Sequence, residues 1–105
     1  MTEAVLVLTT AGQEVEAQNI AQELVMRRLA ACVNIVPRIH SVYRWEGKVE
    51  SAEEFLLIIK TTKTRSTDVK AAIRELHSYD LPECVVISIE SGSEEYLRWI
   101  QESVD

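Results

Sequence analysis

Two long strand-like segments around a single turn limit the folds open to this chain more than any other feature. Residues Ala31 to Arg44 are rich in β-branched side chains, and Glu50 to Thr62 contains the run "FLLIIKTT". Glu46 and Gly47 join the two as a hairpin. Arms of about 14 residues reach roughly 45 Å at ~3.3 Å per residue, whereas a domain with a radius of gyration near 13 Å is about 33 Å across. The sequence therefore predicts a hairpin that overhangs its own domain.

The overhanging end of the hairpin is apolar, with Val42, Tyr43, Trp45 and Val49 close to the turn. A lone two-stranded ribbon is marginally stable in water, and exposed apolar side chains on it promote aggregation. The simplest cover is another copy of the chain. We therefore expect Tyr43, Trp45 and Val49 to lie in an interface between copies of the chain. The alternative is that Tyr43 and Trp45 fill an ordinary core or lie singly on the surface.

The segments before and within the hairpin give the first strand, the first helix and a bend. Glu3 to Thr10 is a continuous Val-rich run typical of a central strand. Gln13 to Ala30 has the apolar spacing of a helix, and Thr10 and Gln13 have capping-box spacing. Pro37 has no N–H for a strand ladder, so a bulge or an edge position is expected there.

The second half of the chain predicts a helix, a strand and a last helix. Ser66 is the expected cap of the helix, "ECVVISIE" follows Pro82 as the strand, and Ser91 with Glu94 opens the C-terminal helix. The order βαββαβ specifies an α+β, ferredoxin-like sandwich in which right-handed crossovers give the strand order 4-1-3-2. We expect residues 1–105 to form a single domain with a long hairpin and a C-terminal helix.

Composition limits the possible partners, location and disulfide bonds of the chain. The net charge is -6, so nucleic acid is a poor partner. No segment approaches the roughly 18 apolar residues of a membrane span, and "MTEAVLVLTT" lacks a basic n-region, so a cytoplasmic location is expected. Cys32 and Cys84 would lie on opposite sheet edges, roughly 14 Å apart, beyond the ~7 Å limit for a disulfide. Two reduced thiols are expected.

The chain resembles the CutA family, the divalent-cation-tolerance proteins, over nearly its whole length. The segments that carry the resemblance, in this order, are "LAACVNIVP", "SVYRWEGKVE", "LLIIKTT", "HSYDLPE" and "EYLRWI". Two positions depart from the family: its His-Pro-Tyr is His77-Ser78-Tyr79 here, and the glycine usual after Pro37 is Arg38. The resemblance implies a ferredoxin-like fold in a tight homotrimer, a role in divalent metal tolerance, and no family-wide reaction.

Some family members are proposed to bind copper through a strand-one cysteine, a histidine and a glutamate. The resemblance places these positions at Thr9, at Leu76 with His77 adjacent, and at Glu83. His77 and Glu83 would hold copper or zinc if a third ligand joined them, and Cys32 of a neighbouring subunit is the candidate. No obligatory cofactor is expected. The alternative is that His77 caps a helix, Glu83 pairs with a lysine and Cys32 is a small core residue.

Tyr43, Lys60 and Tyr79 form a second candidate site, a small-molecule cleft between subunits. This site corresponds to an alternative function as a trimeric signalling module resembling the PII regulators, which share this topology. The three glycines are scattered, however, and make no phosphate-binding loop. An acylphosphatase-like enzyme is disfavoured because "TTAGQE" after the first strand contains no arginine.

Overall fold

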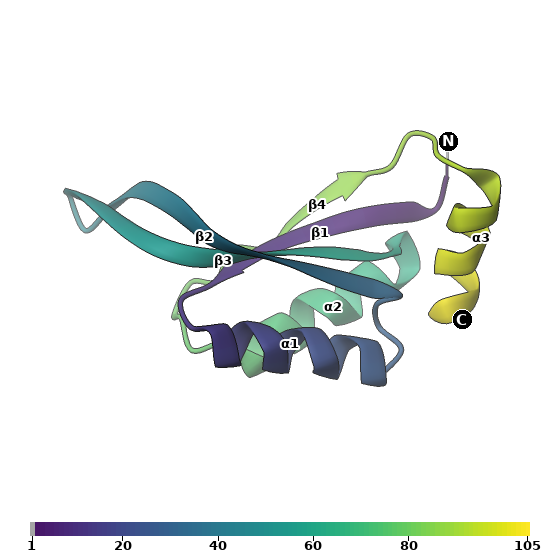
Figure 1. Cartoon of the computed structure of the whole chain (residues 1–105), viewed down its shortest axis with the longest axis horizontal. Helices are drawn as coiled ribbons and strands as arrows, with labels where there is room; N and C mark the ends of the chain where they lie inside the picture. Colours follow the sequence, from purple (N-terminus) through teal and green to yellow (C-terminus); the bar gives the residue numbers. More distant parts are fainter. Residues whose placement is uncertain (1) are drawn as a thin grey trace.

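The described residues form a four-stranded antiparallel sheet and three helices (Figure 1). The computed structural model describes residues 2–105. The elements in chain order are β1 (Ala4–Ala11), α1 (Glu14–Met26), β2 (Cys32–Trp45), β3 (Lys48–Thr62), α2 (Lys63–Leu76), β4 (Val85–Ser88) and α3 (Glu94–Ser103). Both cysteines are free, as expected. Among the described residues, none of the helices has the length and apolar character needed to cross a membrane.

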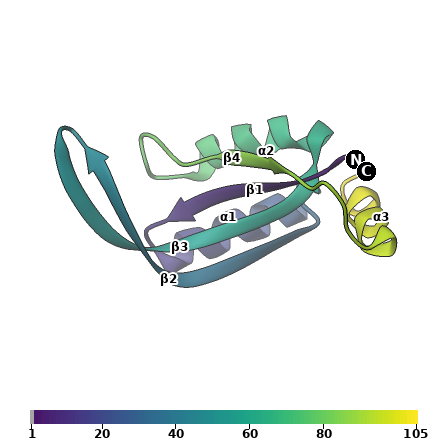
Figure 2. The ribbon, with the colours of Figure 1, turned by 90° about the horizontal axis from the view of Figure 1, so that it is seen from above.

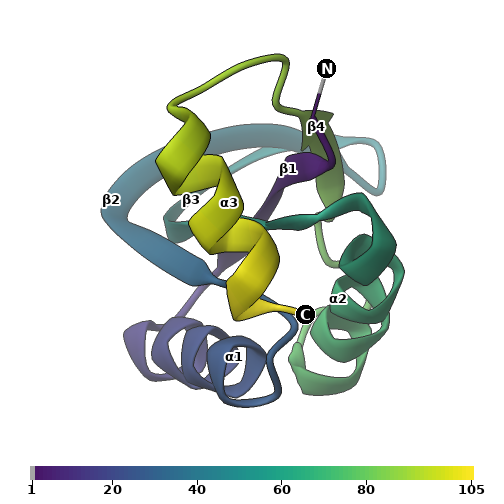
Figure 3. The ribbon, with the colours of Figure 1, turned by 90° about the vertical axis from the view of Figure 1, so that its right-hand side faces the viewer.

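The strand order β2-β3-β1-β4 confirms the α+β, ferredoxin-like prediction. α1 and α2 cover one face of the sheet (Figure 1). The core lies between that face and the two helices, where side chains are removed from water almost completely. Its largest members are Ile20, Leu24, Leu57, Ile59 and Ile73. α3 crosses the end of the sheet near the N-terminus (Figure 3).

Helix boundaries were predicted less accurately than helix existence. α1 ends at Met26, four residues before the expected end, because Arg28 has φ +60 and cannot continue a right-handed helix. Its N-cap is Gln13, whose side chain makes no capping bond, so the predicted box with Thr10 is wrong. Thr10 lies instead inside β1.

The other two predicted caps were also displaced. The N-cap of α2 is Thr62, whose hydroxyl accepts from the Arg65 amide, while Ser66 lies inside the helix and donates to the Lys63 carbonyl. The N-cap of α3 is Ser93 and not Ser91. Several serine and threonine residues near the start of a helix can each accept hydrogen bonds from the unpaired N–H groups of its first turn. Spacing alone therefore does not identify the cap.

The hairpin overhangs the sheet as predicted (Figures 1 and 2). β1 pairs with β3 only as far as Phe55, so β3 from Lys48 to Glu54 pairs with β2 alone. The molecule is 44 Å long and 25 Å across. A register shift between Val36 and Ile39 confirms the bulge at Pro37, and Arg38 takes a left-handed φ of +60 there.

Within residues 2–105, the opposite face of the sheet has no helix over it except α3 at one end (Figure 2). Pairing places Leu6 opposite Ile87, and Leu8 opposite both Ile58 and Val85. Side chains opposite one another share a face, so these five apolar residues form one surface, which we call the open face. Val85 and Ile87 are 47% and 42% exposed.

The hairpin turn offers a test of backbone strain. Glu46 (φ +50) and Gly47 (φ +79) are both left-handed, as a two-residue type I′ turn requires. Glutamate disfavours this conformation and asparagine tolerates it, so Glu46→Asn is expected to raise the free energy of unfolding by about 1 kcal/mol. Urea unfolding at fixed protein concentration measures the change. Glu50→Asn, in the extended part of β3, is the control and should give no gain; an equal gain in both variants would contradict the strain argument.

Candidate functional site

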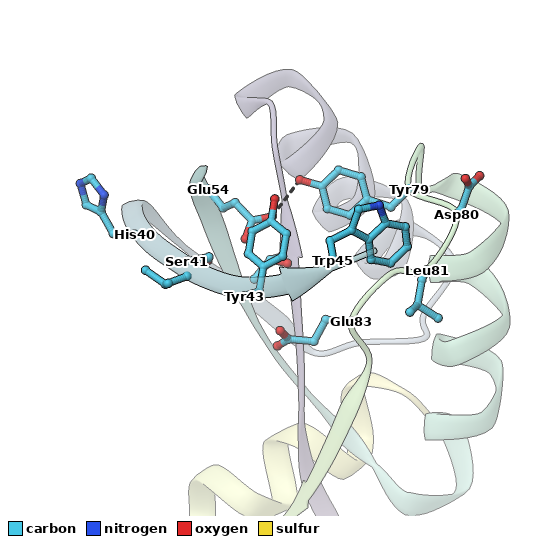
Figure 4. A pocket seen from close by; sticks show the side chains of 11 residues that line it. His40, Ser41, Tyr43, Trp45, Glu54, Tyr79, Asp80, Leu81 and Glu83 are labelled. Atoms are coloured by element: carbon cyan, nitrogen blue, oxygen red, sulfur yellow. Dashed lines mark hydrogen bonds between the residues drawn. The ribbon is translucent and has the colours of Figure 1, made fainter. Parts of the chain in front are cut away.

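A cavity of about 680 Å³ lies between the hairpin and the loop that joins α2 to β4 (Figure 4). The hairpin contributes Tyr43, Trp45 and Glu54, and the loop contributes Tyr79 and Glu83. Thr10, His40, Ser41, Val42, Asp80 and Leu81 complete the lining. Two of the three residues predicted for the small-molecule cleft, Tyr43 and Tyr79, therefore meet within one chain.

The loop is anchored to the sheet by His77, whose side chain is fully buried. The ring Nε2 donates to the Thr10 carbonyl, and Nδ1 accepts from the Tyr79 amide at 3.1 Å. Nδ1 also lies 3.2 Å from Oε1 of Glu16. Glu16 holds the adjacent residue, since its carboxylate accepts from the Ser78 amide at 2.7 Å and from the Ser78 hydroxyl at 2.9 Å. Both imidazole nitrogens are thus used inside the chain.

Tyr79 connects the loop to the base of the hairpin. Its hydroxyl donates to Glu54 Oε2 at 2.7 Å, and a Cβ added to Gly12 would lie 2.8 Å from that hydroxyl. A larger residue at position 12 would therefore require the Tyr79 side chain or the Gly12 backbone to shift. Burial, followed by the hydrogen bond to Glu54, raises the pKa of Tyr79 above its ordinary value.

The raised pKa of Tyr79 predicts a loss of stability in alkali. Because the unfolded phenol ionises near pH 10 and the folded one at higher pH, its contribution is complete below about pH 10 and is lost as pH rises further. Tyr79→Phe should therefore show a shallower fall in the free energy of unfolding between pH 9 and 11, measured by urea titration. Tyr96→Phe is the control. A fall as steep as that of wild type in Tyr79→Phe would contradict the assignment.

Lys60 and Cys32 lie at the other end of the sheet. They pair with each other across β2 and β3, and Lys60 also pairs with Leu6 on β1. Thr10, beside His77, is four residues further along β1, or about 13 Å. Lys60 Nζ donates to the Tyr96 hydroxyl at 3.3 Å. Within one chain, Lys60 therefore does not join the tyrosines of the predicted cleft.

The predicted metal ligands are also dispersed. Cys32 Sγ lies 3.9 Å from Asn34 Oδ1, far along the sheet from His77. Throughout residues 2–105, no group of three or more His, Cys, Asp or Glu side chains is close enough to hold a metal ion. Thr9, at the position of the family's cysteine, is fully buried, and its hydroxyl is unpaired within the described part of the chain. The three predicted ligands therefore do not meet within the described residues of one chain.

The predicted interface residues are exposed in the single chain. Tyr43, Trp45 and Val49 are 44%, 45% and 67% exposed. Tyr43 and Trp45 belong to the same strand face as each other, two residues apart, and both line the cavity. Val49 pairs with Arg44, so it lies on the opposite face of the ribbon. Their burial between subunits stays a prediction.

Glu54 is the residue of this site that sequence reasoning missed. It is buried and holds the Tyr79 hydroxyl. A signal was present, because Glu54 has the same parity as Leu56 and Ile58 and so belongs to the open-face side of β3. A carboxylate in register with apolar neighbours is unusual enough to mark a site.

Residues 5–103 match a family model described as "CutA1 divalent ion tolerance protein". The "Divalent-cation tolerance protein CutA" of Thermus thermophilus is 46% identical over 101 residues, which is 96% of this chain and 97% of that protein. A crystal structure of CutA from Xylella fastidiosa gives a TM-score of 0.97 at 36% identity, with 99% and 100% of the two chains covered. A structure described as the periplasmic CutA of Archaeoglobus fulgidus gives 0.94 at 42% identity, covering 97% and 99%. The similarity extends over nearly the whole chain.

Proposed function

The chain belongs to the CutA1 divalent ion tolerance protein family, and from this premise we propose that it acts as a non-enzymatic homotrimer in the tolerance of divalent metal ions. The family and its relatives are named for tolerance and not for a catalysed reaction. The assembly, the metal ions and the absence of catalysis are parts of this proposal.

The open face is the observation that carries the proposal. It joins apolar side chains of three strands, Leu6 and Leu8 with Ile58, Val85 and Ile87. In the described part of the chain, only α3 at one end reaches this face (Figure 2). Contiguous apolar surfaces of this kind mark protein interfaces. The projecting hairpin, which one chain cannot cover by itself, supports the same conclusion.

Two different sheet edges favour a closed ring. β2 and β4 are the outer strands, and each has one unpaired side. Pairing β2 of one chain with β4 of the next is heterologous, and such contacts form rings when the rotation closes. The number of subunits, three, comes from the family resemblance. The ring would also leave no exposed strand edge, which prevents uncontrolled association.

Divalent copper or zinc is proposed to bind weakly, with Glu83 from one chain and residues such as Cys32 from a neighbour. His77 would have to give up its bond to Thr10 or to Tyr79 before it could coordinate a metal.

Calorimetric titration of the assembled protein with Cu²⁺ or Zn²⁺ tests the metal proposal. Glu83→Gln and Cys32→Ser are expected to weaken binding by about tenfold or more, because a charged or thiolate ligand is lost. Glu90→Gln, an exposed carboxylate beyond β4, is the control. Unchanged affinity in both site variants would assign the binding to adventitious surface groups. Tolerance itself is tested by growth in added metal with and without the gene.

The cytoplasmic location stays a prediction. The two free thiols fit a reducing compartment. The Archaeoglobus relative is described as periplasmic, so membership of the family does not define the compartment. Fractionation of cells that express the chain would assign it.

Small-molecule binding is a second candidate function, favoured by the cavity beside the hairpin. Its volume lies within the usual range of roughly 300–1,000 Å³ for small-molecule sites. The PII-like form of this proposal, with a nucleotide as the ligand, is disfavoured because Glu54, Asp80 and Glu83 line the cavity and would repel phosphates.

A further inference from the structure

The cavity beside the hairpin has an unusual combination of walls. Three of its eleven lining residues are aromatic (Tyr43, Trp45 and Tyr79), and three are acidic (Glu54, Asp80 and Glu83). None of the eleven is lysine or arginine. In Figure 4 the Tyr79 hydroxyl points at Glu54, Tyr43 overlaps Glu54 in this view, and Trp45 lies farther away beside Tyr79, while His40 and Asp80 lie at the two outer ends. Aromatic faces and carboxylates both attract positive charge, so the two kinds of wall select the same class of ligand.

Glu54 is the second, independent observation. Its residue is 7% exposed, and its only hydrogen bond in the described residues comes from the neutral Tyr79 hydroxyl to Oε2. None of the ion pairs found in residues 2–105 includes it. A buried carboxylate is costly unless a cation compensates it. Within residues 2–105, no basic side chain supplies this compensation to Glu54.

The geometry points to an organic ammonium ion as the ligand of this cavity, with its charged nitrogen at Glu54 and the rings of Tyr43, Trp45 and Tyr79 along the walls. The apolar part of such a ligand would lie against Leu81 and Val42, which complete the walls. This inference rests on the small-molecule candidate function and adds the chemical class of the ligand. Because Tyr43 and Trp45 also belong to the proposed interface, the cavity would lie between subunits in the trimer.

Two other cations would fit the same negative charge. A bare metal ion needs several donor groups converging on one point, and no such group of His, Cys, Asp and Glu occurs in residues 2–105. A cavity of about 680 Å³ is also far larger than such an ion requires. The other cation is a basic side chain of a second copy of the chain, which would make Glu54 part of the assembly contact. The experiment separates these cases.

Binding of benzylamine and of benzyltrimethylammonium to the full chain is measured by calorimetry, with benzyl alcohol as the uncharged analogue and Zn²⁺ as the metal. Both ammonium ions are expected to bind at least about tenfold tighter than the alcohol, and Glu54→Gln is expected to remove most of this preference. Glu53→Gln is the matched control, since it makes the same change at the adjacent, exposed position of β3. Trp45→Leu tests the aromatic wall, and it is expected to weaken binding of the ammonium ions more than binding of the alcohol.

The outcomes decide the inference. Equal binding of the alcohol and the ammonium ions would reduce the cavity to an apolar pocket and overturn it, and so would binding of Zn²⁺ alone. Native mass spectra of each variant report the assembly at the same time. If Glu54→Gln lowers the assembled mass and leaves ammonium binding unchanged, Glu54 pairs with a second chain and the inference is wrong. If the chain is found as a monomer that still binds the ammonium ions through Glu54, the inference holds and the trimer proposal fails.

Discussion

Replacing Trp45 with alanine is expected to shift the assembled protein toward single chains at micromolar concentration. Trp45 is 45% exposed at the end of β2, and in the proposed trimer a neighbouring chain covers it. Truncation of a large aromatic anchor typically costs about 2 kcal/mol or more, or roughly a 30-fold weaker contact. Sedimentation velocity across a dilution series measures the shift.

The control for Trp45→Ala is Met26→Ala. Met26 is 74% exposed at the end of α1, away from the hairpin and from the open face. Its truncation is expected to leave the mass unchanged at every concentration. If Trp45→Ala dissociates no more readily than this control, Trp45 is not an interface residue.

A carboxylate in the middle of the open face is expected to prevent assembly altogether. Ile58 pairs with Leu8 and lies opposite Asn34 on the other side, so it is central to the sheet. Ile58→Asp would place a negative charge of every subunit in a contact that excludes water, at a cost of several kcal/mol for each chain. The separated chain is expected to keep most of its helical content by circular dichroism, because the core between the sheet and α1 and α2 is on the other face.

Val15→Asp is the matched control for Ile58→Asp. Val15 is 78% exposed on α1, so its replacement adds the same charge at a site that the proposed assembly leaves in water. The control should keep the wild-type mass. Retention of that mass by Ile58→Asp would show that the open face is not the surface where the copies meet.

The elements and their order could be predicted because local patterns specify them strongly. The Val-rich run of β1 and the long segments around Gly47 have the composition of strands, and right-handed crossovers then leave one sheet order. The helix ends could not be predicted equally well. Arg28 takes a left-handed conformation that is rare for arginine, and the true caps, Thr62 and Ser93, compete with similar residues nearby.

Only part of the candidate site could be predicted from the sequence. Family motifs drew attention to Tyr43, Tyr79 and Glu83, which do line one cavity. They gave no indication that the ring of His77 is committed to Thr10 and to the Tyr79 amide, because these bonds depend on how the α2–β4 loop folds back over β1. The position of Lys60 at the far end of the sheet follows from the β1–β3 register, which the sequence pattern alone did not specify.

The mass of the wild-type protein in solution tests the central claim, that the open face and the projecting hairpin are covered by two further copies of the chain. Sedimentation equilibrium at micromolar concentration is expected to give three times the chain mass of 11.9 kDa, without dissociation on tenfold dilution. A mass of 11.9 kDa under these conditions would contradict the account, since the apolar side chains of the open face would then lie in water.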